Sequence, residues 1–238
     1  MKPPPFDPEL GTFLESIAHL IGPPPTREEL PAVRRPSPLQ PRPTDEELSR
    51  DGRFRITEDG PLVICLPADA PGPVPALYWM HGGGMVMGDN RSGGLVQMLD
   101  LVADLPAAVI AVNYGLAPEH PHPQPVEDGH GVWDRRANAF GWGCLLGDAA
   151  GGPDVSPYAA PARATDLSGL PPAYVDVGSA ETFRDEDVAY ANAIWQAGGV
   201  AELHVWPGAF HGFDGFVPDS RLARQAWATR REWLTRVL

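Results

Sequence analysis

The stretch of this chain with the clearest chemical potential is a short apolar run that ends in His81 and three consecutive glycines, Gly82, Gly83 and Gly84. Glycine lets the backbone turn sharply and approach a ligand closely. Several free N–H donors at the end of a strand suit an oxygen atom that gains negative charge in a reaction. The alternative is a glycine-rich turn that binds nothing, and the triplet alone does not decide between the two.

Two other groups of candidate ligands carry less weight. His120 and His122 lie two residues apart, which is a spacing found in metal sites. Prolines on both sides fit a structural turn better, so we expect no metal there. The two cysteines, Cys65 and Cys144, have no CxxC spacing and indicate neither a zinc site nor a disulfide framework. We expect no cofactor.

The composition limits the classes of partner. A chain of 238 residues with 43% hydrophobic residues is long enough for one sizeable α/β domain. Its formal net charge of −13 argues against nucleic acid and anionic membranes as partners. We find no apolar signal segment at the N-terminus and no run of about 18 apolar residues. The expectation is therefore a cytoplasmic protein without membrane contact.

Alternating strand and helix signals indicate the elements that must position these residues. An amphipathic helix is expected over residues 8–21, with a Pro-rich extended segment after it. Expected strands cover residues 53–57, 62–66, 76–80, 107–112, 173–177 and 201–206, and expected helices 95–105, 126–133, 187–197 and 220–238. Strands 76–80 and 107–112 have the composition of strands buried on both faces. Such alternation predicts an α/β fold whose mostly parallel sheet is flanked by helices.

Four strings in a fixed order give the chain a family resemblance. They are HGGG, YGLAPEHPHPQPVED, LPPAYVDVGSAETFRDEDVAYA and VWPGAFHGFD. With them the chain resembles the bacterial hormone-sensitive-lipase family of α/β-hydrolase carboxylesterases. It departs at Gly115, where the family usually has Arg, and at His122, where Phe is usual. The resemblance implies an α/β-hydrolase fold and short-chain acyl esters as substrates.

The family chemistry needs a serine on a strand–turn–helix elbow, a histidine base, an acid that orients the histidine, and an oxyanion hole. The resemblance assigns His211 as the base, Glu181 as the acid with Asp185 as the alternative, and the glycine triplet behind His81 as the oxyanion hole. Simpler interpretations stay open: His211 could be an ordinary histidine in a surface loop, and Glu181 could cap a helix.

The nucleophile is missing from its expected string. The family elbow reads GDSAGG or similar, whereas residues 147–152 read GDAAGG, with Ala149 where the serine would stand. Either this is an elbow whose serine has been replaced, or it is an unrelated loop and the elbow is absent. An elbow follows a buried strand and precedes a helix. Because Gly141 and Gly143 precede the string and Pro153 follows it, we favour the second interpretation.

The length of the chain agrees with the loss of an internal block of sequence, since family members are roughly seventy residues longer. We place the junction near residues 134–136 and expect the block to have carried two central strands and the elbow. The expected domains are an N-terminal cap segment, residues 1–50, and a shortened hydrolase domain, residues 51–238. Four other residues are weighed as nucleophiles and none is expected on an elbow: Ser92, Ser156, Ser179 and Cys144.

Two functional hypotheses follow. The first is an ester hydrolase by descent that acts on short acyl esters. The second is a catalytically silent remnant that binds a small acyl ligand or a partner. A sheet without its central strands has an exposed edge, which favours association of copies into a homo-oligomer.

Overall fold

The computed structural model describes residues 5–35, 42–92, 94–119 and 133–238. The chain forms two compact units. Unit 1 consists of Met1–Pro24 and His120–Ala226, and unit 2 of Pro25–Glu119 and Trp227–Leu238. The division at residue 50 that we expect from the sequence stays a prediction.

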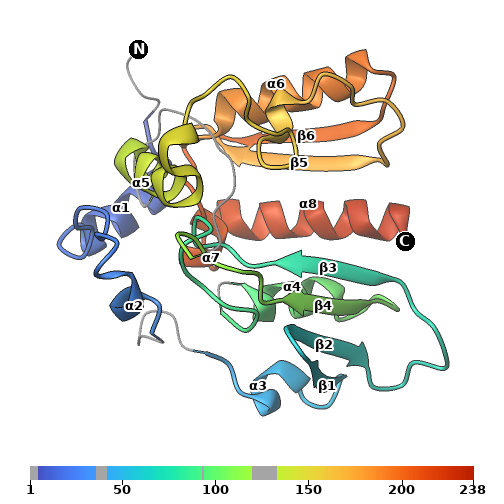
Figure 1. Ribbon diagram of the computed structural model, residues 1–238. Coiled ribbons are helices and arrows are strands. Elements are labelled where there is room, and N and C mark those ends of the chain that lie inside the picture. The colour runs from blue at the N-terminus through green and yellow to red at the C-terminus, as the bar shows by residue number, and fades with distance from the viewer. Residues whose placement is uncertain (1–4, 36–41, 93, 120–132) are drawn as a thin grey trace. The chain divides into compact units, whose positions relative to one another are not determined.

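Unit 2 contains a four-stranded mixed sheet with the order β1-β2-β4-β3 (Figure 1). β2 pairs antiparallel with both β1 and β4, whereas β3 and β4 are parallel. Two helices, α3 and α4, pack beside the sheet. The bounds are β1 (Phe54–Asp59), β2 (Leu62–Pro67), β3 (Ala76–Met80), β4 (Ala108–Val112), α3 (Asp45–Ser49) and α4 (Leu95–Val102).

The core of unit 2 lies between α4 and one face of the sheet. Leu95 and Leu99 are four residues apart on α4 and are fully buried. They belong to one cluster with Val63 and Cys65 of β2 and Val109 of β4. Residues two apart on a strand share a face, so this alternation fixes which face of the sheet is covered.

β3 differs from its sequence prediction. Its residues are those expected, but Tyr78 is 60% and Met80 65% exposed, while Leu77 and Trp79 pack against the core. Among the described strands β3 pairs with β4 alone, so it lies at an edge of the sheet. The prediction of burial on both faces is therefore wrong for β3, whereas β4 is largely buried as expected.

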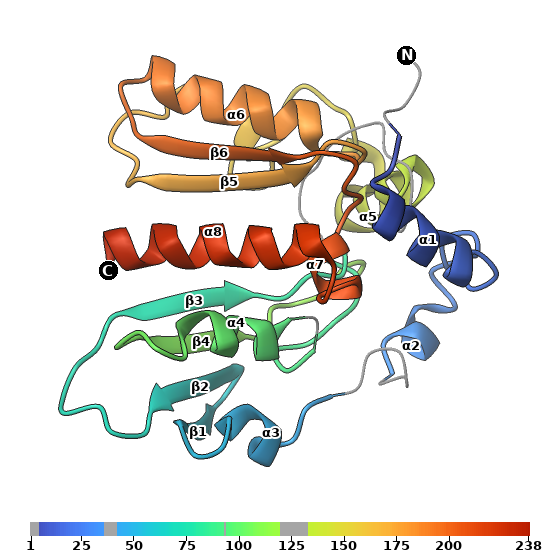
Figure 2. The ribbon, with the colours of Figure 1, turned by 180° about the vertical axis from the view of Figure 1, so that it is seen from behind.

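Unit 1 contains a parallel pair, β5 (Ala173–Gly178) and β6 (Ala201–Trp206). The helix α6 (Arg184–Gln196) covers one face of this pair, as the two opposite views show (Figure 1 and Figure 2). Flanking helices on both sheets confirm the predicted α/β class.

The first helix, α1 (Pro8–Ile17), ends four residues earlier than its apolar stripe predicts. Asp7 caps it by accepting a hydrogen bond of 3.0 Å from the N–H of Glu9. Leu10 and Leu14 are buried, but Leu20 and Ile21 are 53% and 41% exposed, so nothing covers an extension of the helix.

The helix α5 (Arg135–Leu146) occupies residues for which the sequence predicts no element. Asp134 caps it by accepting hydrogen bonds from two backbone N–H groups at 2.9 Å. The helix expected over residues 126–133 lies outside the described residues except for Trp133. The remaining elements are α2 (Leu30–Val33), η1 (Gly147–Ala149), η2 (Pro161–Arg163), α7 (Phe213–Phe216) and α8 (Arg221–Val237).

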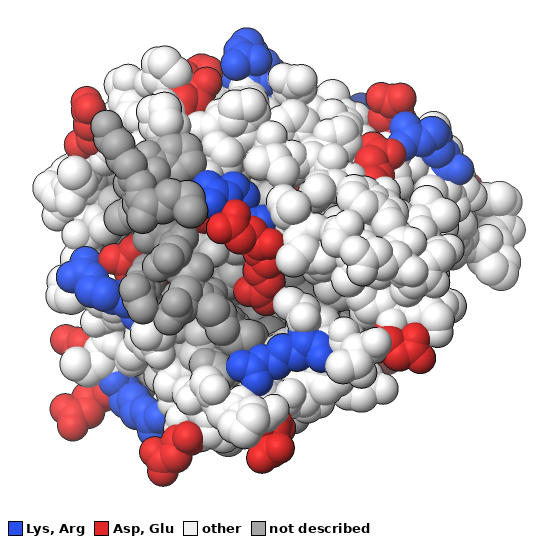
Figure 3. Space-filling view, turned by 90° about the horizontal axis from the view of Figure 1, so that it is seen from above, with Lys and Arg blue, Asp and Glu red and all other residues white. Residues whose placement is uncertain are grey.

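Charged side chains on the face drawn in Figure 3 form small groups in which acidic and basic residues are often neighbours. In the described parts of the chain no helix is long and apolar enough to cross a membrane.

Candidate active site

The structure brings together the two side chains that the resemblance singles out. Glu181 follows β5 and His211 follows β6, so both lie beyond the carboxyl ends of neighbouring parallel strands. Nδ1 of His211 is 2.7 Å from Oε2 of Glu181. Because a carboxylate oxygen accepts, Nδ1 carries a proton, and in the neutral ring Nε2 then has a free lone pair. The Glu181 side chain is 6% exposed and that of His211 42%, which is the arrangement of an oriented base.

Two aromatic rings flank His211. Phe183 lies edge-on with its ring centroid 5.5 Å from the imidazole, and Trp133 lies at 6.2 Å. Thr182 donates a hydrogen bond of 3.0 Å to the carbonyl oxygen of Trp133. The residue next to the expected junction is thereby fixed beside the histidine.

The N-terminal segment holds the loop that carries His211. The N–H of Asp7 donates to the carbonyl oxygen of Gly208 at 2.9 Å, and a Cβ on Gly208 would lie 2.1 Å from the Asp7 nitrogen. Gly208 also has a positive φ, which favours glycine. Phe210 is fully buried and stacks on Phe13 of α1.

The alternative acid, Asp185, is placed differently. Its side chain is 82% exposed on α6, and Arg184 Nε lies 2.7 Å from its Oδ1. The hydrogen bond from Arg184 lowers the pKa of Asp185. Glu181 is thus the carboxylate that the structure brings to His211.

A third acidic residue, Asp187, is a feature that the sequence interpretation missed. Burial raises its pKa to about 7, Glu181 and Glu186 add to this effect, and His211 opposes it. Its only signal in the sequence is a further acid in the string RDED.

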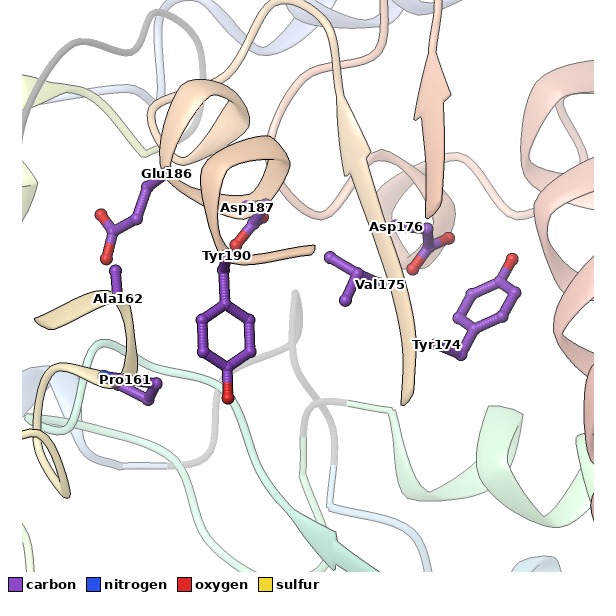
Figure 4. A pocket seen from close by; sticks show the side chains of 8 residues that line it. All are labelled: Pro161, Ala162, Tyr174, Val175, Asp176, Glu186, Asp187 and Tyr190. Carbon is purple, nitrogen blue, oxygen red and sulfur yellow. The ribbon is translucent and has the colours of Figure 1, made fainter. Parts of the chain in front are cut away.

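Asp187 lines a cavity of about 400 Å³ between α6, β5 and η2 (Figure 4). Val175 points from β5 toward α6, whereas Tyr174 and Asp176 project from the other side of the strand. Glu186 and Tyr190 of α6 also line the cavity. Burial in this partly apolar space, with the carboxylate of Glu186 nearby, explains the cost of ionising Asp187.

The glycine loop of unit 2 has a shape that few residues other than glycine permit. Gly83 has φ +119°, and a Cβ there would lie 2.2 Å from the carbonyl oxygen of Met87. A Cβ on Gly88 would lie 2.5 Å from Nδ1 of His81. The N–H groups of Gly82 to Gly84 have no acceptor among the described residues.

His81 supports this loop from inside. It is 3% exposed, its ring stacks on Tyr114 at 4.2 Å, and the Tyr114 hydroxyl donates to its carbonyl oxygen at 2.7 Å. Nδ1 lies 2.8 Å from the carbonyl oxygen of Gly82, so Nδ1 carries the proton. Burial lowers the pKa of His81 and favours its neutral form.

Arg34 is a second residue that the sequence interpretation missed. Its Nε donates to the carbonyl oxygen of Val86 at 2.8 Å and its Nη2 to that of Ala117 at 2.6 Å. It also forms an ion pair with Glu119. These bonds tie the glycine loop to the segment after β4.

The residues weighed as nucleophiles lie in different parts of the fold. Ala149 lies in η1 directly after α5, not after a strand. The hydroxyls of Ser92 and Ser156 each accept a hydrogen bond from a backbone N–H of their own loop. The hydroxyl of Ser179, directly after β5, accepts one from the N–H of Gly208 in the loop after β6, and Cys144 is 2% exposed. His120 and His122 lie outside the described residues, and within those described no group of three or more potential ligands is arranged to hold a metal.

Solved esterase structures share this fold. The structure resembles esterase LipW from Mycobacterium marinum with a TM-score of 0.73 and 23% identity, over 98% of this chain and 97% of that one. The relatives from Mycobacterium tuberculosis include esterase LipI and carboxylesterase NlhH. Esterase LipI is 27% identical over 215 aligned positions, covering 60% of this chain and 67% of LipI. Carboxylesterase NlhH is 25% identical over 282 positions, covering 87% of each protein.

A family model described as the alpha/beta hydrolase fold matches residues 77–153 and 131–215, which together make up more than half of the chain. The chain belongs to this α/β-hydrolase family, within its carboxylic ester hydrolases of the hormone-sensitive-lipase type.

Proposed function

We propose that this chain is an ester hydrolase by descent that has lost its serine nucleophile and binds small acyl ligands without serine-dependent turnover. In this proposal His211 is the former catalytic base, Glu181 its acid, and Gly82 to Gly84 the oxyanion loop. The observation that carries the proposal is the position of GDAAGG at the end of helix α5.

An elbow exposes its nucleophile because the chain turns sharply from a strand into a helix. Ala149 follows a helix instead, its side chain is exposed, and Pro153 stands where the next helix would begin. A methyl group in this position also has no proton to give to a base.

The comparisons support an internal loss near residues 134–136. For NlhH, 87% of 238 residues is about 207, so about 75 of the 282 aligned positions have no residue of this chain. For LipI, 60% of 238 is about 143, which leaves about 72 of 215 positions. Residues 131–153 belong to both stretches that match the family model, so the two matches overlap in this chain.

Fluorophosphonates, which label activated serines, provide the direct test. We expect no labelling of the purified protein, and no hydrolysis of ethyl butyrate above the buffer rate. Removing the serine of a triad lowers kcat by about a millionfold. Labelling with one probe per chain, together with hydrolysis that the probe abolishes, would contradict the proposal.

Ala149→Ser separates the two interpretations of GDAAGG. If this string were an elbow that had lost only its hydroxyl, the substitution would restore fluorophosphonate labelling. We expect none, because the residue follows a helix. The neighbouring substitution Ala150→Ser is the matched control.

An active hydrolase with a substitute nucleophile is the second candidate. The short His211–Glu181 bond favours it, since this pair is oriented as a base. Mass spectrometry of a fluorophosphonate-labelled peptide would name the substitute residue.

A further inference from the structure

No described residue forms a hydrogen bond with the edge of the His211 ring that faces away from Glu181. Nδ1 is held at 2.7 Å by a carboxylate that is itself 6% exposed, whereas the histidine side chain is 42% exposed. Within the described parts of the chain Nε2 has no hydrogen-bond partner. Phe183 and Trp133 flank the ring, with centroids 5.5 Å and 6.2 Å from it.

An unprotonated imidazole nitrogen is itself a nucleophile toward acyl groups. In a serine hydrolase the serine hydroxyl lies between this nitrogen and the substrate. Without a serine the nitrogen meets the acyl carbon directly. Glu181 then stabilises the positive charge that develops on the ring, as it would when the ring accepts a proton.

We infer that His211 is the nucleophile of a serine-independent acyl transfer from activated aryl esters, an inference that rests on the proposed function. Nε2 bonds to the carbonyl carbon, the bond to the aryl oxygen breaks, and the electron pair leaves with the aryl oxide. The ring then carries the acyl group and one positive charge, which faces Glu181. Water attacks the acyl carbon, the acyl–nitrogen bond breaks, a carboxylate is released and two protons pass to solvent.

The geometry also sets the substrate class. In a serine hydrolase the histidine carries the serine proton to the leaving group. Here the same nitrogen holds the acyl group, so it has no proton to deliver. Only a leaving group that is stable as an anion departs under these conditions. Aryl esters therefore react and alkyl esters do not.

Stopped-flow measurement with p-nitrophenyl butyrate tests the inference. We expect a burst of up to one p-nitrophenolate per chain, unchanged by prior fluorophosphonate treatment. His211→Gln should reduce the release to the buffer rate, and Glu181→Gln should slow it at least tenfold. The matched control is His204→Gln, because His204 is also half-exposed and pairs with a glutamate, Glu202, at 3.0 Å. Equal bursts from the wild type and His211→Gln would overturn the inference.

A second measurement needs no variant. Acid quenching during the burst, followed by peptide mass spectrometry, should place a butyryl group on His211, and hydroxylamine should remove it as the hydroxamate. An acyl group found only on another residue would overturn the inference. Fluorophosphonate labelling would overturn the proposed function, whereas an absent adduct without such labelling would overturn this inference alone.

Discussion

At the scale of single residues, two glycines are required by contacts of the backbone. Gly88→Ala would place a Cβ 2.5 Å from Nδ1 of His81 and 2.6 Å from the carbonyl oxygen of Gly82, at φ +94°. We expect the free energy of unfolding to fall by more than the roughly 1–2 kcal/mol that a left-handed conformation costs a residue with a Cβ. Urea unfolding measures this change in the free energy of unfolding.

Gly82→Ala is the matched control for this prediction. No atom lies within 4 Å of a Cβ built on Gly82, and its φ is not in the left-handed region. Its free energy of unfolding should stay close to that of the wild type. An equal loss in both variants would contradict the steric explanation.

Asp187 should make the stability of unit 1 depend on pH. Its pKa is raised from about 4 in an unfolded chain to about 7 here, so the folded state binds the proton more tightly. The stability that this proton contributes is complete below about pH 4 and is lost as the pH rises through about 7. Asp187→Asn should therefore raise the urea midpoint at pH 8 and leave it nearly unchanged at pH 4.

Asp185→Asn is the control on the same helix. The Asp185 carboxylate is exposed and its pKa is lowered, so this substitution should give no gain at pH 8. A higher urea midpoint at pH 8 in both variants would indicate that the gain comes from reduced overall charge repulsion, and not from removal of the buried charge of Asp187.

At the scale of elements, α1 is expected to determine the order of the loop that carries His211. Leu10 is fully buried in one cluster with Phe210 and Trp206. Leu10→Ala should cost about 2–5 kcal/mol and increase hydrogen exchange at residues 208–211. Leu20→Ala, in the same segment but 53% exposed, should leave both unchanged. Unchanged exchange in Leu10→Ala would show that α1 does not hold this loop.

Elements with a strong local pattern could be predicted from the sequence. β3 and β6 have the predicted bounds, because each is a short run of apolar and β-favouring residues between turn signals. The exposure of Tyr78 and Met80 on β3 could not be predicted, since it depends on which elements cover each face of the sheet. α5 was missed because its glycines disfavour a helix, although Asp134 caps it.

The candidate site likewise contains some residues that the sequence predicts and others that only the fold reveals. His211, Glu181 and the glycine triplet belong to strings that can be recognised along the chain. Arg34 could not be found in this way, because the carbonyl groups that it binds are 52 and 83 residues away. The raised pKa of Asp187 likewise depends on neighbours that only the fold assembles.

At the scale of the whole molecule, each unit has buried residues of its own. Leu99 is fully buried in the core of unit 2 and Ile194 in α6 of unit 1. Leu99→Ala should lower the hydrogen-exchange protection of β4 more than that of β6, and Ile194→Ala should do the reverse. Each should cost about 2–5 kcal/mol. A uniform loss of protection in both variants would mean that the two units unfold as one.

The steric origin of the glycine loop bears on how its motif is interpreted in evolution. Gly83 and Gly88 are demanded by folding alone, so a lineage that no longer hydrolyses esters would still retain them. Their presence in a descendant gene is therefore no evidence of selection for catalysis. Gly82 is different, because the fold leaves space for a larger side chain there. Substitutions at Gly82 in related genes, with Gly83 and Gly88 unchanged, would indicate that the loop is no longer under selection as an oxyanion hole.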